Sequence, residues 1–468
     1  MLIDRYPHED VFARVPELAA QTDPILVQID RLLEDDGLYQ QVRADLAQRY
    51  PHTAVHGRHS TPAEVLLRLL VVKHLYDWSY QETEERVKDS LVLRWFTRVY
   101  FCRVPDDTTL LRWAQTIRPS TVQALNDRVS QLAAQVRVTR ARKLRVDSTV
   151  VQTAIHHPTD GGLLADGVRV LSRLVRRAKP LVSEQLGGVR EAFRSRVRSM
   201  RQELRHLHRL LRRKGEEVAA QQQTIYQKLL TTTTQMVRQA EHVHEALLSL
   251  SEAQPAPPPL ARRLQAQLEH VLPLVGRVIP QARTRVLEGG KVAAADKVVS
   301  LFEPHSRVIP RHKGGAEVEF GRQVVLGEVE GGLIVHYHLL AEGESDRQAS
   351  LPAVRHHRAV FGHPPRLLTG DRGTHEAKLE AQAKALGVEQ VVVPRSGPMT
   401  AAQRARERER GWRRRYRWRA GVEGRISSLR RDYGLGRCLD HGEDGMERRV
   451  GWGILASNLW HIGRARAA

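Results

Sequence analysis

One acidic residue inside an apolar segment constrains this 468-residue chain more than any other feature. Residues 144–151 read Leu-Arg-Val-Asp-Ser-Thr-Val-Val, and Asp147 lies in the middle of that run. The many β-branched residues are typical of a buried β-strand. A carboxylate in such a strand is costly unless it is paired or binds a metal ion. The segment therefore predicts a strand that carries a paired or metal-binding acid.

A second acid follows another apolar run. Residues 366–370 read Arg-Leu-Leu-Thr-Gly, and Asp371 comes next, before Gly373 and a helix-like segment at 376–386. This pattern places Asp371 at the carboxyl end of a strand. Open α/β sheets hold their functional sites at that end, so we expect Asp371 to belong to a site.

A third acid belongs to a regularly spaced set. Tyr416, Arg419, Glu423 and Arg430 stand at positions i, i+3, i+7 and i+14, which on one helix fall within an arc of about 60°. A carboxylate ligates hard divalent cations, and guanidinium groups bind phosphate oxygens in pairs. The alternative is an arginine-rich surface helix, because nine arginines stand between positions 404 and 419.

Three acids in this order, on a strand, at a strand end and on a helix, resemble the Asp-Asp-Glu triad of insertion-sequence transposases and integrases. The set from Tyr416 to Arg430 resembles the Tyr-Arg-Glu-Lys signature of cut-and-paste bacterial transposases, with Arg430 where the family usually has lysine. The resemblance implies an α/β fold with a ribonuclease-H-like catalytic core. Residues 318–326 and 332–340 would be its second and third strands, and residues 389–393 its fifth.

The same resemblance implies a site and a reaction. Asp147, Asp371 and Glu423 would be catalytic and would hold two divalent metal ions, Mg²⁺ or alternatively Mn²⁺. Tyr416, Arg419 and Arg430 would bind the DNA backbone. The implied function is a DDE transposase that cleaves DNA at insertion-sequence ends and transfers the strands. Two alternatives are a non-catalytic DNA-binding protein derived from a transposase, and a nuclease that cuts without joining.

The charge of the chain agrees with a nucleic-acid partner. Lysine and arginine number 74 against 53 aspartate and glutamate, a net charge of +21, and such an excess attracts phosphate backbones. A ribosome-associated or membrane-surface protein would share this bias. Aromatic residues make up 5% of the chain, so base stacking on single strands is not the expected mode. We expect double-stranded DNA as partner, both transposon ends and target, bound by a homodimer or higher oligomer.

Cysteine content and hydropathy indicate the compartment. Cys102 and Cys438 supply neither a zinc ligand set nor a disulfide framework. No apolar run approaches the 18 or more residues of a membrane span. These features predict a soluble bacterial protein without a membrane partner, located in the cytoplasm and associated with the nucleoid.

The N-terminal 140 residues are expected to form an all-α domain. Helical patterns at 65–75, 81–93 and 108–117 suit a helix-turn-helix-like DNA-binding module. Residues 67–113 also resemble the domain that precedes the catalytic core in this transposase group. The alternative is a helical packing domain without a role in DNA binding.

A long helical insertion is expected to interrupt the core. The core would consist of residues 141–160 and 296–445, separated by an insertion at 161–295. Helical patterns lie at 162–174, at 189–250 as one or two long helices or an antiparallel coiled-coil hairpin, and at 261–278. This insertion would hold transposon-end DNA or a second subunit. Asp160 and Asp166 at its start favour helix capping over metal binding. A C-terminal helix at 446–468 would pack behind the helix that carries Glu423.

Overall fold

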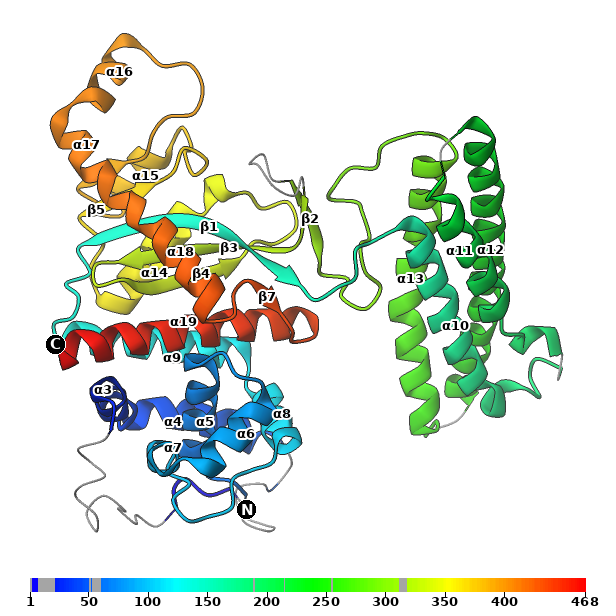
Figure 1. Cartoon of the computed structure of the whole chain (residues 1–468), viewed down its shortest axis with the longest axis horizontal. Coiled ribbons are helices and arrows are strands. Elements are labelled where there is room, and N and C mark those ends of the chain that lie inside the picture. Colours follow the sequence, from blue (N-terminus) through cyan, green and yellow to red (C-terminus); the bar gives the residue numbers. More distant parts are fainter. Residues whose placement is uncertain are drawn as a thin grey trace. The chain divides into compact units, whose positions relative to one another are not determined.

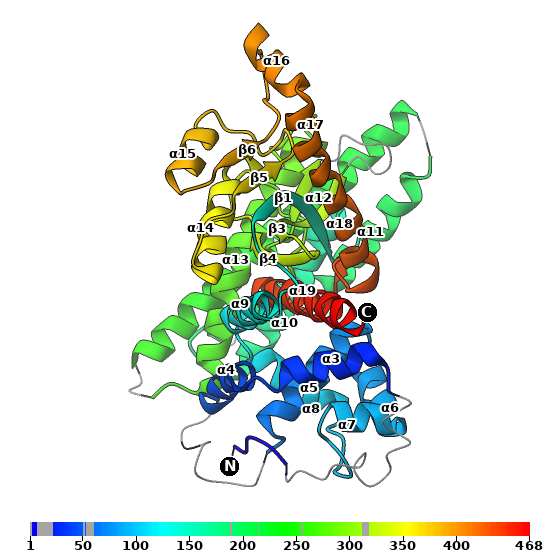
Figure 2. The same ribbon diagram turned by 90° about the vertical axis from the view of Figure 1, so that its left-hand side faces the viewer.

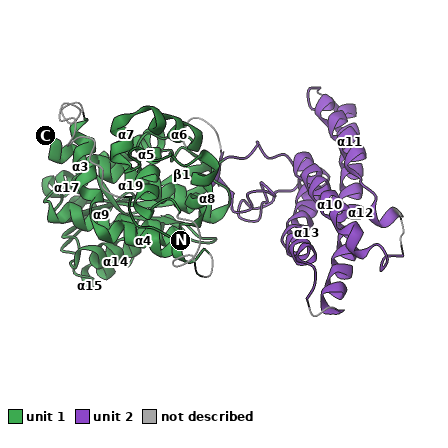
Figure 3. Ribbon diagram, turned by 90° about the horizontal axis from the view of Figure 1, so that it is seen from below, with its two compact units in different colours: residues 1–153, 322–468 green, residues 154–321 purple. Residues whose placement is uncertain are grey.

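The chain folds into two compact units (Figure 3). The computed structural model describes residues 2–6, 22–49, 52, 60–187, 190–213, 215–253, 256–310 and 318–468. Unit 1 comprises Met1–Thr153 and Arg322–Ala468, and unit 2 comprises Ala154–Gly321. The expected insertion at 161–295 lies wholly within unit 2, whereas the N-terminal helices share unit 1 with most of the sheet.

A mixed β-sheet forms the centre of unit 1. Its strands are β1 (Lys143–Thr153), β3 (Val318–Val329), β4 (Leu333–Leu339), β5 (Leu367–Gly370), β6 (Gln390–Val392) and β7 (Arg437–Cys438). The strand order is β3-β1-β5-β6, with β4 beside β3 and β7 beside β1. β1, β5 and β6 run parallel to one another, and β3 and β4 form an antiparallel hairpin. The strands expected from the apolar segments are confirmed.

Helices cover both faces of this sheet (Figure 2). One face carries α14 (Ser350–Phe361) and α15 (Leu379–Ala385), and the other carries α17 (Arg410–Arg417) and α18 (Gly421–Asp432). A further helix, α16 (Ala401–Arg408), precedes α17. The helix expected at 376–386 is confirmed but begins three residues later than its pattern indicates.

The last helix, α19 (Gly442–Ala467), lies between the sheet and the N-terminal helices (Figure 1). It packs against α3, α5, α9 and β4. The buried amide of Asn458 accepts from the backbone N–H of Ile334 at 2.9 Å and donates to its carbonyl at 2.8 Å, which joins α19 to β4. It also contacts α18, as expected for a helix behind the one that carries Glu423, but α3, α5, α9 and β4 surround it as well. The reason is that α19 is buried on nearly all sides, Trp452 included, and so needs partners around it.

Seven N-terminal helices complete unit 1 in the described part of the chain. They are α3 (Pro24–Leu33), α4 (Asp36–Ala47), α5 (Ala63–Leu75), α6 (Tyr80–Asp89), α7 (Leu91–Phe96), α8 (Asp107–Thr116) and α9 (Pro119–Gln135). The single helix expected at 81–93 is two helices, because Ser90 caps a new one by accepting from the Leu93 N–H at 3.2 Å.

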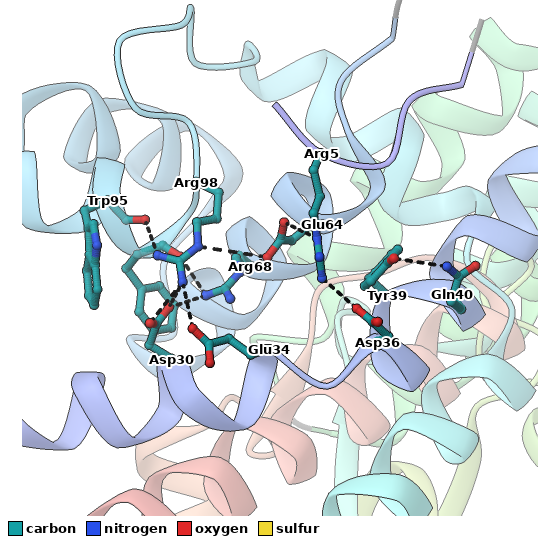
Figure 4. Close-up of polar contacts among 11 residues, drawn as sticks. Arg5, Asp30, Glu34, Asp36, Tyr39, Gln40, Glu64, Arg68, Trp95 and Arg98 are labelled. Atoms are coloured by element: carbon teal, nitrogen blue, oxygen red, sulfur yellow. Dashed lines mark hydrogen bonds and ion pairs between the residues drawn. The ribbon is translucent and has the colours of Figure 1, made fainter. Parts of the chain in front are cut away.

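A buried cluster of charges joins three of these helices (Figure 4). Arg68 on α5 is 0% exposed and donates to Asp30 on α3 at 2.6 Å and to Glu64 at 3.1 Å. It also donates to the carbonyl oxygen of Phe96 on α7 at 3.0 Å. Arg98 contacts Asp30 at 2.9 Å as well. Since the guanidinium of Arg68 lies out of water, these carboxylates are needed to hold it.

Unit 2 is a helical bundle. It contains α10 (Asp160–Val182), α11 (Val197–Leu210), α12 (Glu216–Ala253) and α13 (Pro259–Val286), together with β2 (Arg307–Pro310), which pairs with the first residues of β3. α10, α12 and α13 pack on one another, and α11 packs on α10 and α12. The helices expected in this insertion are confirmed. α11 and α12 pack on each other where the hairpin was expected, and the apolar faces of α10 and α13 complete one core with them.

The two acids at the start of unit 2 both pair with arginines. Asp160 occupies the first turn of α10, directly after the N-cap Thr159, and accepts from Arg285 at 2.7 Å. Asp166 pairs with Arg169 at 2.8 Å. Asp160 therefore has the helix-start setting that its sequence indicates. Separately, none of the helices in the described residues is both long and apolar enough to cross a membrane.

Asp30→Asn should destabilise unit 1 by about 3–5 kcal/mol, because it leaves two buried guanidinium groups without their shared carboxylate. All seven tryptophans of the chain belong to unit 1, so urea unfolding followed by tryptophan fluorescence reports on that unit alone.

Asp36→Asn is the matched control. The side chain of Asp36 is 70% exposed and pairs with Arg5 at 2.8 Å, so its loss should cost less than about 1 kcal/mol. Equal effects of the two substitutions would show that the buried cluster does not stabilise the helices.

Candidate active site

Two of the predicted acids lie side by side on neighbouring strands. β1 and β5 are parallel, and their last paired residues are Val146 and Gly370. Asp147 and Asp371 each stand one position further along. Because neighbouring strands lie about 4.8 Å apart, the two carboxylates share one end of the β1–β5 pair. Asp371 is held there by the N–H of Thr374, which donates to its side chain at 2.9 Å.

Asp147 is a largely buried carboxylate with partners for both oxygens. Its Oδ1 accepts from the N–H of Ser148 at 2.8 Å, and its Oδ2 accepts from Arg419 at 3.0 Å. Burial nevertheless raises the pKa of Asp147 above its usual value, and the negative charge of Asp371 raises it further, against the lowering by Ser148 and Arg419. Asp147 and Asp371 share the positive charge of Arg419, so the pair can still attract a further cation.

Arg419 joins the strand acids to the helix acid. One guanidinium nitrogen lies 3.0 Å from Asp147 Oδ2, and another lies 3.6 Å from Glu423 Oε1. The Arg419 side chain is 17% exposed, whereas that of Glu423 is 69% exposed. The structure thus assembles Asp147, Asp371, Arg419 and Glu423 in one place, with Glu423 at the solvent side.

A second arginine on β1 fixes the turn that carries Arg419. Arg145, two residues before Asp147 and so on the same face of the strand, donates to the Trp418 carbonyl at 2.5 Å and stacks over the Trp418 ring at 4.7 Å. Its other nitrogens donate to buried Glu328 on β3 at 2.9 and 2.5 Å. Gly421 leaves room for this guanidinium, since a Cβ there would lie 2.6 Å from it.

The contact between Arg145 and the Trp418 carbonyl explains why the prediction of one continuous helix is wrong in detail. Residues 410–432 form α17, the 3₁₀ turn η3 (Trp418–Ala420) and α18 rather than one α-helix. The Trp418 carbonyl accepts from Arg145 instead of serving an uninterrupted helix. A 3₁₀ turn winds more tightly than an α-helix, so it changes the angular spacing between the side chains before and after it.

The other two members of the predicted set lie further from the acids. Tyr416 stacks on Trp412 at 5.1 Å and packs with it against Leu367 of β5 and Val392 of β6. Arg430 is half-buried on α18, seven residues beyond Glu423 and so about 10 Å along the helix axis. The structure therefore places Arg419, but not Tyr416 or Arg430, in hydrogen-bond contact with the predicted acids.

Arg419 lies among the carboxylates that are predicted to bind metal. Across the described residues, no group of three or more His, Cys, Asp and Glu side chains is arranged to hold a metal ion. Instead of a metal ion, the guanidinium group of Arg419 lies between Asp147 and Glu423. The donor set still suits a divalent cation, because two adjacent, partly desolvated carboxylates are hard oxygen ligands that lack a full complement of positive charge.

Sequence reasoning missed Arg145 and Glu328. A signal for the first existed, because Arg145 and Asp147 alternate with Leu144 and Val146 in one strand, which places both charges on one face. Glu328 gave no comparable signal, since its partner is 183 positions away in the sequence.

The opposite face of β1 carries a separate polar contact. Ser148 donates to Asp346 at 2.7 Å, and Gln323 donates to Ser148 at 3.0 Å. Side chains of successive strand residues point to opposite faces, so this contact does not belong to the group around Asp147.

Comparisons with known proteins match both ends of the chain. Residues 14–116 match the profile of a transposase domain, DUF772, and residues 296–459 match that of a transposase DDE domain. The second match includes Asp371 and Glu423, whereas Asp147 lies outside both. No solved structure matches the chain.

One curated relative is the uncharacterized protein ORF8 in the nfe locus of Rhizobium meliloti. It is 31% identical over 129 residues, which cover 26% of this chain and 61% of the relative. The chain thus spans less than two thirds of the relative it matches. The two transposase profiles identify the chain as a member of the DDE-type insertion-sequence transposases.

Proposed function

We propose that this protein is a metal-dependent transposase that cleaves DNA at insertion-sequence ends and transfers the strands to target DNA. The observation that carries this proposal is the position of Asp147 and Asp371 at the same level of two parallel strands, joined through Arg419 to Glu423. The family match supports the general class of reaction, and the site geometry supplies the residues.

A ribonuclease-H-like core is part of this proposal. It is supported by the order of elements along the chain: the strand with Asp147, a hairpin of two strands, a strand that ends before Asp371, a short strand, and the helix with Glu423. The sheet order β4-β3-β1-β5-β6 brings the two strands with acids together at its centre. The helical unit 2 is inserted between the first two of these strands.

Asp147, Asp371 and Glu423 would hold two divalent ions, Mg²⁺ or Mn²⁺. When bound, such ions polarise phosphate oxygens, lower the pKa of bound water and stabilise a leaving oxygen. The exposed side chain of Glu423 is free to change rotamer, since within the described residues it contacts only Arg419, at 3.6 Å. Replacement of Arg419 by cations would leave Asp147 paired and would release the guanidinium for another anion.

Arg419 would then bind a DNA phosphate. Its Nε–H is buried and has no hydrogen-bond partner within the described part of the chain, and guanidinium groups match phosphate geometry. Tyr416 and Arg430 would contact the same backbone on either side. The exposed arginines of α16 and α17 extend this positive surface, and the N-terminal helices would contribute further contacts to duplex DNA. A homodimer or higher oligomer would pair the two ends.

Asp371→Asn should abolish cleavage of DNA that carries the native borders of the gene while leaving binding intact. The amide removes a charged ligand but keeps the shape, and we expect a rate at least about a thousandfold lower, equivalent to ~4 kcal/mol in the barrier. Gel assays of binding and of strand cleavage on one labelled duplex measure both effects. Asp147→Asn and Glu423→Gln should behave alike.

Asp346→Asn is the matched control, because Asp346 lies near β1 but contacts Ser148 on the opposite face. It should cleave at a rate close to wild type. Binding without cleavage by the wild-type protein in Mg²⁺ and in Mn²⁺ would contradict the proposal and favour a DNA-binding protein without activity.

Asp147→Asn should raise the unfolding midpoint of the metal-free protein at pH 7. The pKa of Asp147 is raised in the folded state, so the folded protein binds this proton more readily than the unfolded chain. The stabilising effect of protonation is therefore present at low pH and is lost as pH rises through the folded-state pKa. The advantage of the amide should shrink as pH falls toward about 3.9, the usual aspartate value.

Metal ions should reverse this difference. At a concentration one hundred times the Kd, Mg²⁺ should stabilise the wild type by about 2.7 kcal/mol and should stabilise Asp147→Asn much less. Thermal unfolding with and without Mg²⁺ measures both. Equal stabilisation of the two proteins would place the ion elsewhere.

Arg145→Lys should lower the rate of cleavage without weakening DNA binding. Lysine cannot make the paired contact with Glu328 and also reach the Trp418 carbonyl, so the turn with Arg419 should shift. A displacement of about 1 Å costs on the order of a hundredfold in rate. We expect kcat to fall and KM to stay unchanged in steady-state cleavage.

Arg425→Lys is the control for this effect. Arg425 also lies near Glu328, at 3.8 Å, but does not bind the Trp418 carbonyl. If both lysine variants lose the same activity, weakened pairing of Glu328 explains the result and the turn does not.

A further inference from the structure

A cavity of about 600 Å³ lies in unit 1 between the N-terminal helices and the start of α19. Its walls come from the end of α5, the turn to α6, α8, the segment after β7, and α19. No residue of the predicted triad lines it. Its volume falls within the range of sites that bind small molecules, about 300–1,000 Å³.

Positive side chains that are almost fully buried line this cavity. Lys73 is 3% exposed and Arg449 is 7% exposed. Arg449 pairs with Asp77. Lys73 forms no ion pair within the described residues, and its ammonium lies over the Tyr80 ring at 4.6 Å from the centroid. The carboxylate of Asp77 therefore pairs with Arg449, and Lys73 has no anionic partner among the described residues.

Two further polar atoms here are buried without partners. In the described part of the chain, the Nδ1 atom of His74 has no hydrogen bond although the residue is only 3% exposed. The Nε–H of Arg449 also has none. Buried polar groups are normally satisfied, so unpaired ones beside a cavity indicate a missing ligand. His74 stacks on Trp452 at 5.8 Å, which fixes its ring in the wall.

Basic side chains outnumber acidic ones in the cavity wall: Lys73, Arg437, Arg448 and Arg449 against Asp77, Glu82 and Asp440. Burial and the nearby charge of Arg449 together lower the pKa of Lys73 to about 8, against the opposite effects of Asp440 and Asp77. Burial, Lys73 and Arg449 likewise lower the pKa of His74. An anion placed between Lys73 and Arg449 would reverse these shifts and satisfy the open donors.

We infer that this cavity is a binding site for a phosphate group, held by Lys73, Arg449 and His74. An oxyanion with several acceptor oxygens matches a lysine ammonium, an arginine Nε–H and a histidine N–H. The apolar part of the wall, with Trp78, Leu111 and Trp452, suits a nucleoside attached to that phosphate. The source is either the backbone of DNA or a free nucleotide. DNA as source rests on the proposed function, whereas the phosphate site itself does not.

Titration of the full-length protein with inorganic phosphate tests the site, with tryptophan fluorescence as readout because Trp78 and Trp452 line the cavity. Lys73→Met should bind phosphate at least tenfold more weakly than wild type. Lys88→Met is the matched control, since Lys88 pairs with Glu84 on the surface of α6, and it should bind as wild type does. Equal affinity of Lys73→Met and wild type would overturn the inference.

A second measurement on the wild type covers a failure of Lys73→Met to fold. Acetic anhydride should acetylate Lys73 readily because of its lowered pKa, and phosphate should slow this reaction at least fivefold, as measured by mass spectrometry. No protection by phosphate would contradict the site.

Competition identifies the source of the phosphate and separates this inference from the proposed function. Displacement of bound phosphate by a short duplex indicates DNA, and displacement by adenosine monophosphate alone indicates a free nucleotide. Asp147→Asn should bind phosphate as wild type does. Lys73-dependent phosphate binding by a protein that does not cleave DNA would therefore support this site and refute the transposase activity.

Discussion

The buried pair of Arg145 and Glu328 is the interaction on which the candidate site depends. Glu328 is 0% exposed on β3, and the guanidinium of Arg145 on β1 meets both of its oxygens. A buried ion pair contributes little net stability unless its remaining donors are satisfied. Here the third nitrogen of Arg145 donates to the Trp418 carbonyl, so the pair connects two strands to the turn before α18. Charge at the centre of the sheet thereby sets the position of a helix on its face.

The consequence is a site in which a cation could replace the guanidinium group of Arg419 beside Asp147. Asp147 and Asp371 stand together at one end of two parallel strands, and Arg419 supplies the positive charge that they lack. Glu423 stays at the solvent side and, among the described residues, contacts only the same guanidinium. Such an arrangement keeps the acids compatible with folding before any cation binds. In the proposed function, Arg419 would bind phosphate after a cation releases it from Asp147.

Much of the fold could be predicted because its signals are local. The strand around Asp147, the hairpin of β3 and β4 and the strand before Asp371 each follow from apolar runs and turns. The role of α19 could not be predicted, because it depends on helices more than 300 positions away in the sequence, as the contact of Asn458 with Asn126 at 3.5 Å illustrates. The bundle of unit 2 was missed for a related reason: helical spacing predicts a helix, but not how many neighbours it has.

The strands and the helix that carry the three acids could be predicted, whereas the geometry between them could not. Spacing alone placed Tyr416, Arg419, Glu423 and Arg430 on one helical face, but the anchored turn at Trp418 changes the phase between them. The residue responsible, Arg145, lies far away in the sequence, and its contact with the Trp418 carbonyl becomes visible only when β1 is packed against this turn.

Iron-directed cleavage of the polypeptide tests the central claim most directly, that Asp147, Asp371 and Glu423 hold divalent ions together. With Fe²⁺ in place of Mg²⁺ and with ascorbate and peroxide, hydroxyl radicals cut the backbone close to the bound metal. The account predicts cuts near residues 147, 371 and 423 that excess Mg²⁺ suppresses and that Asp371→Asn lacks. Cuts confined to other segments, or cuts that Mg²⁺ does not suppress, would contradict it.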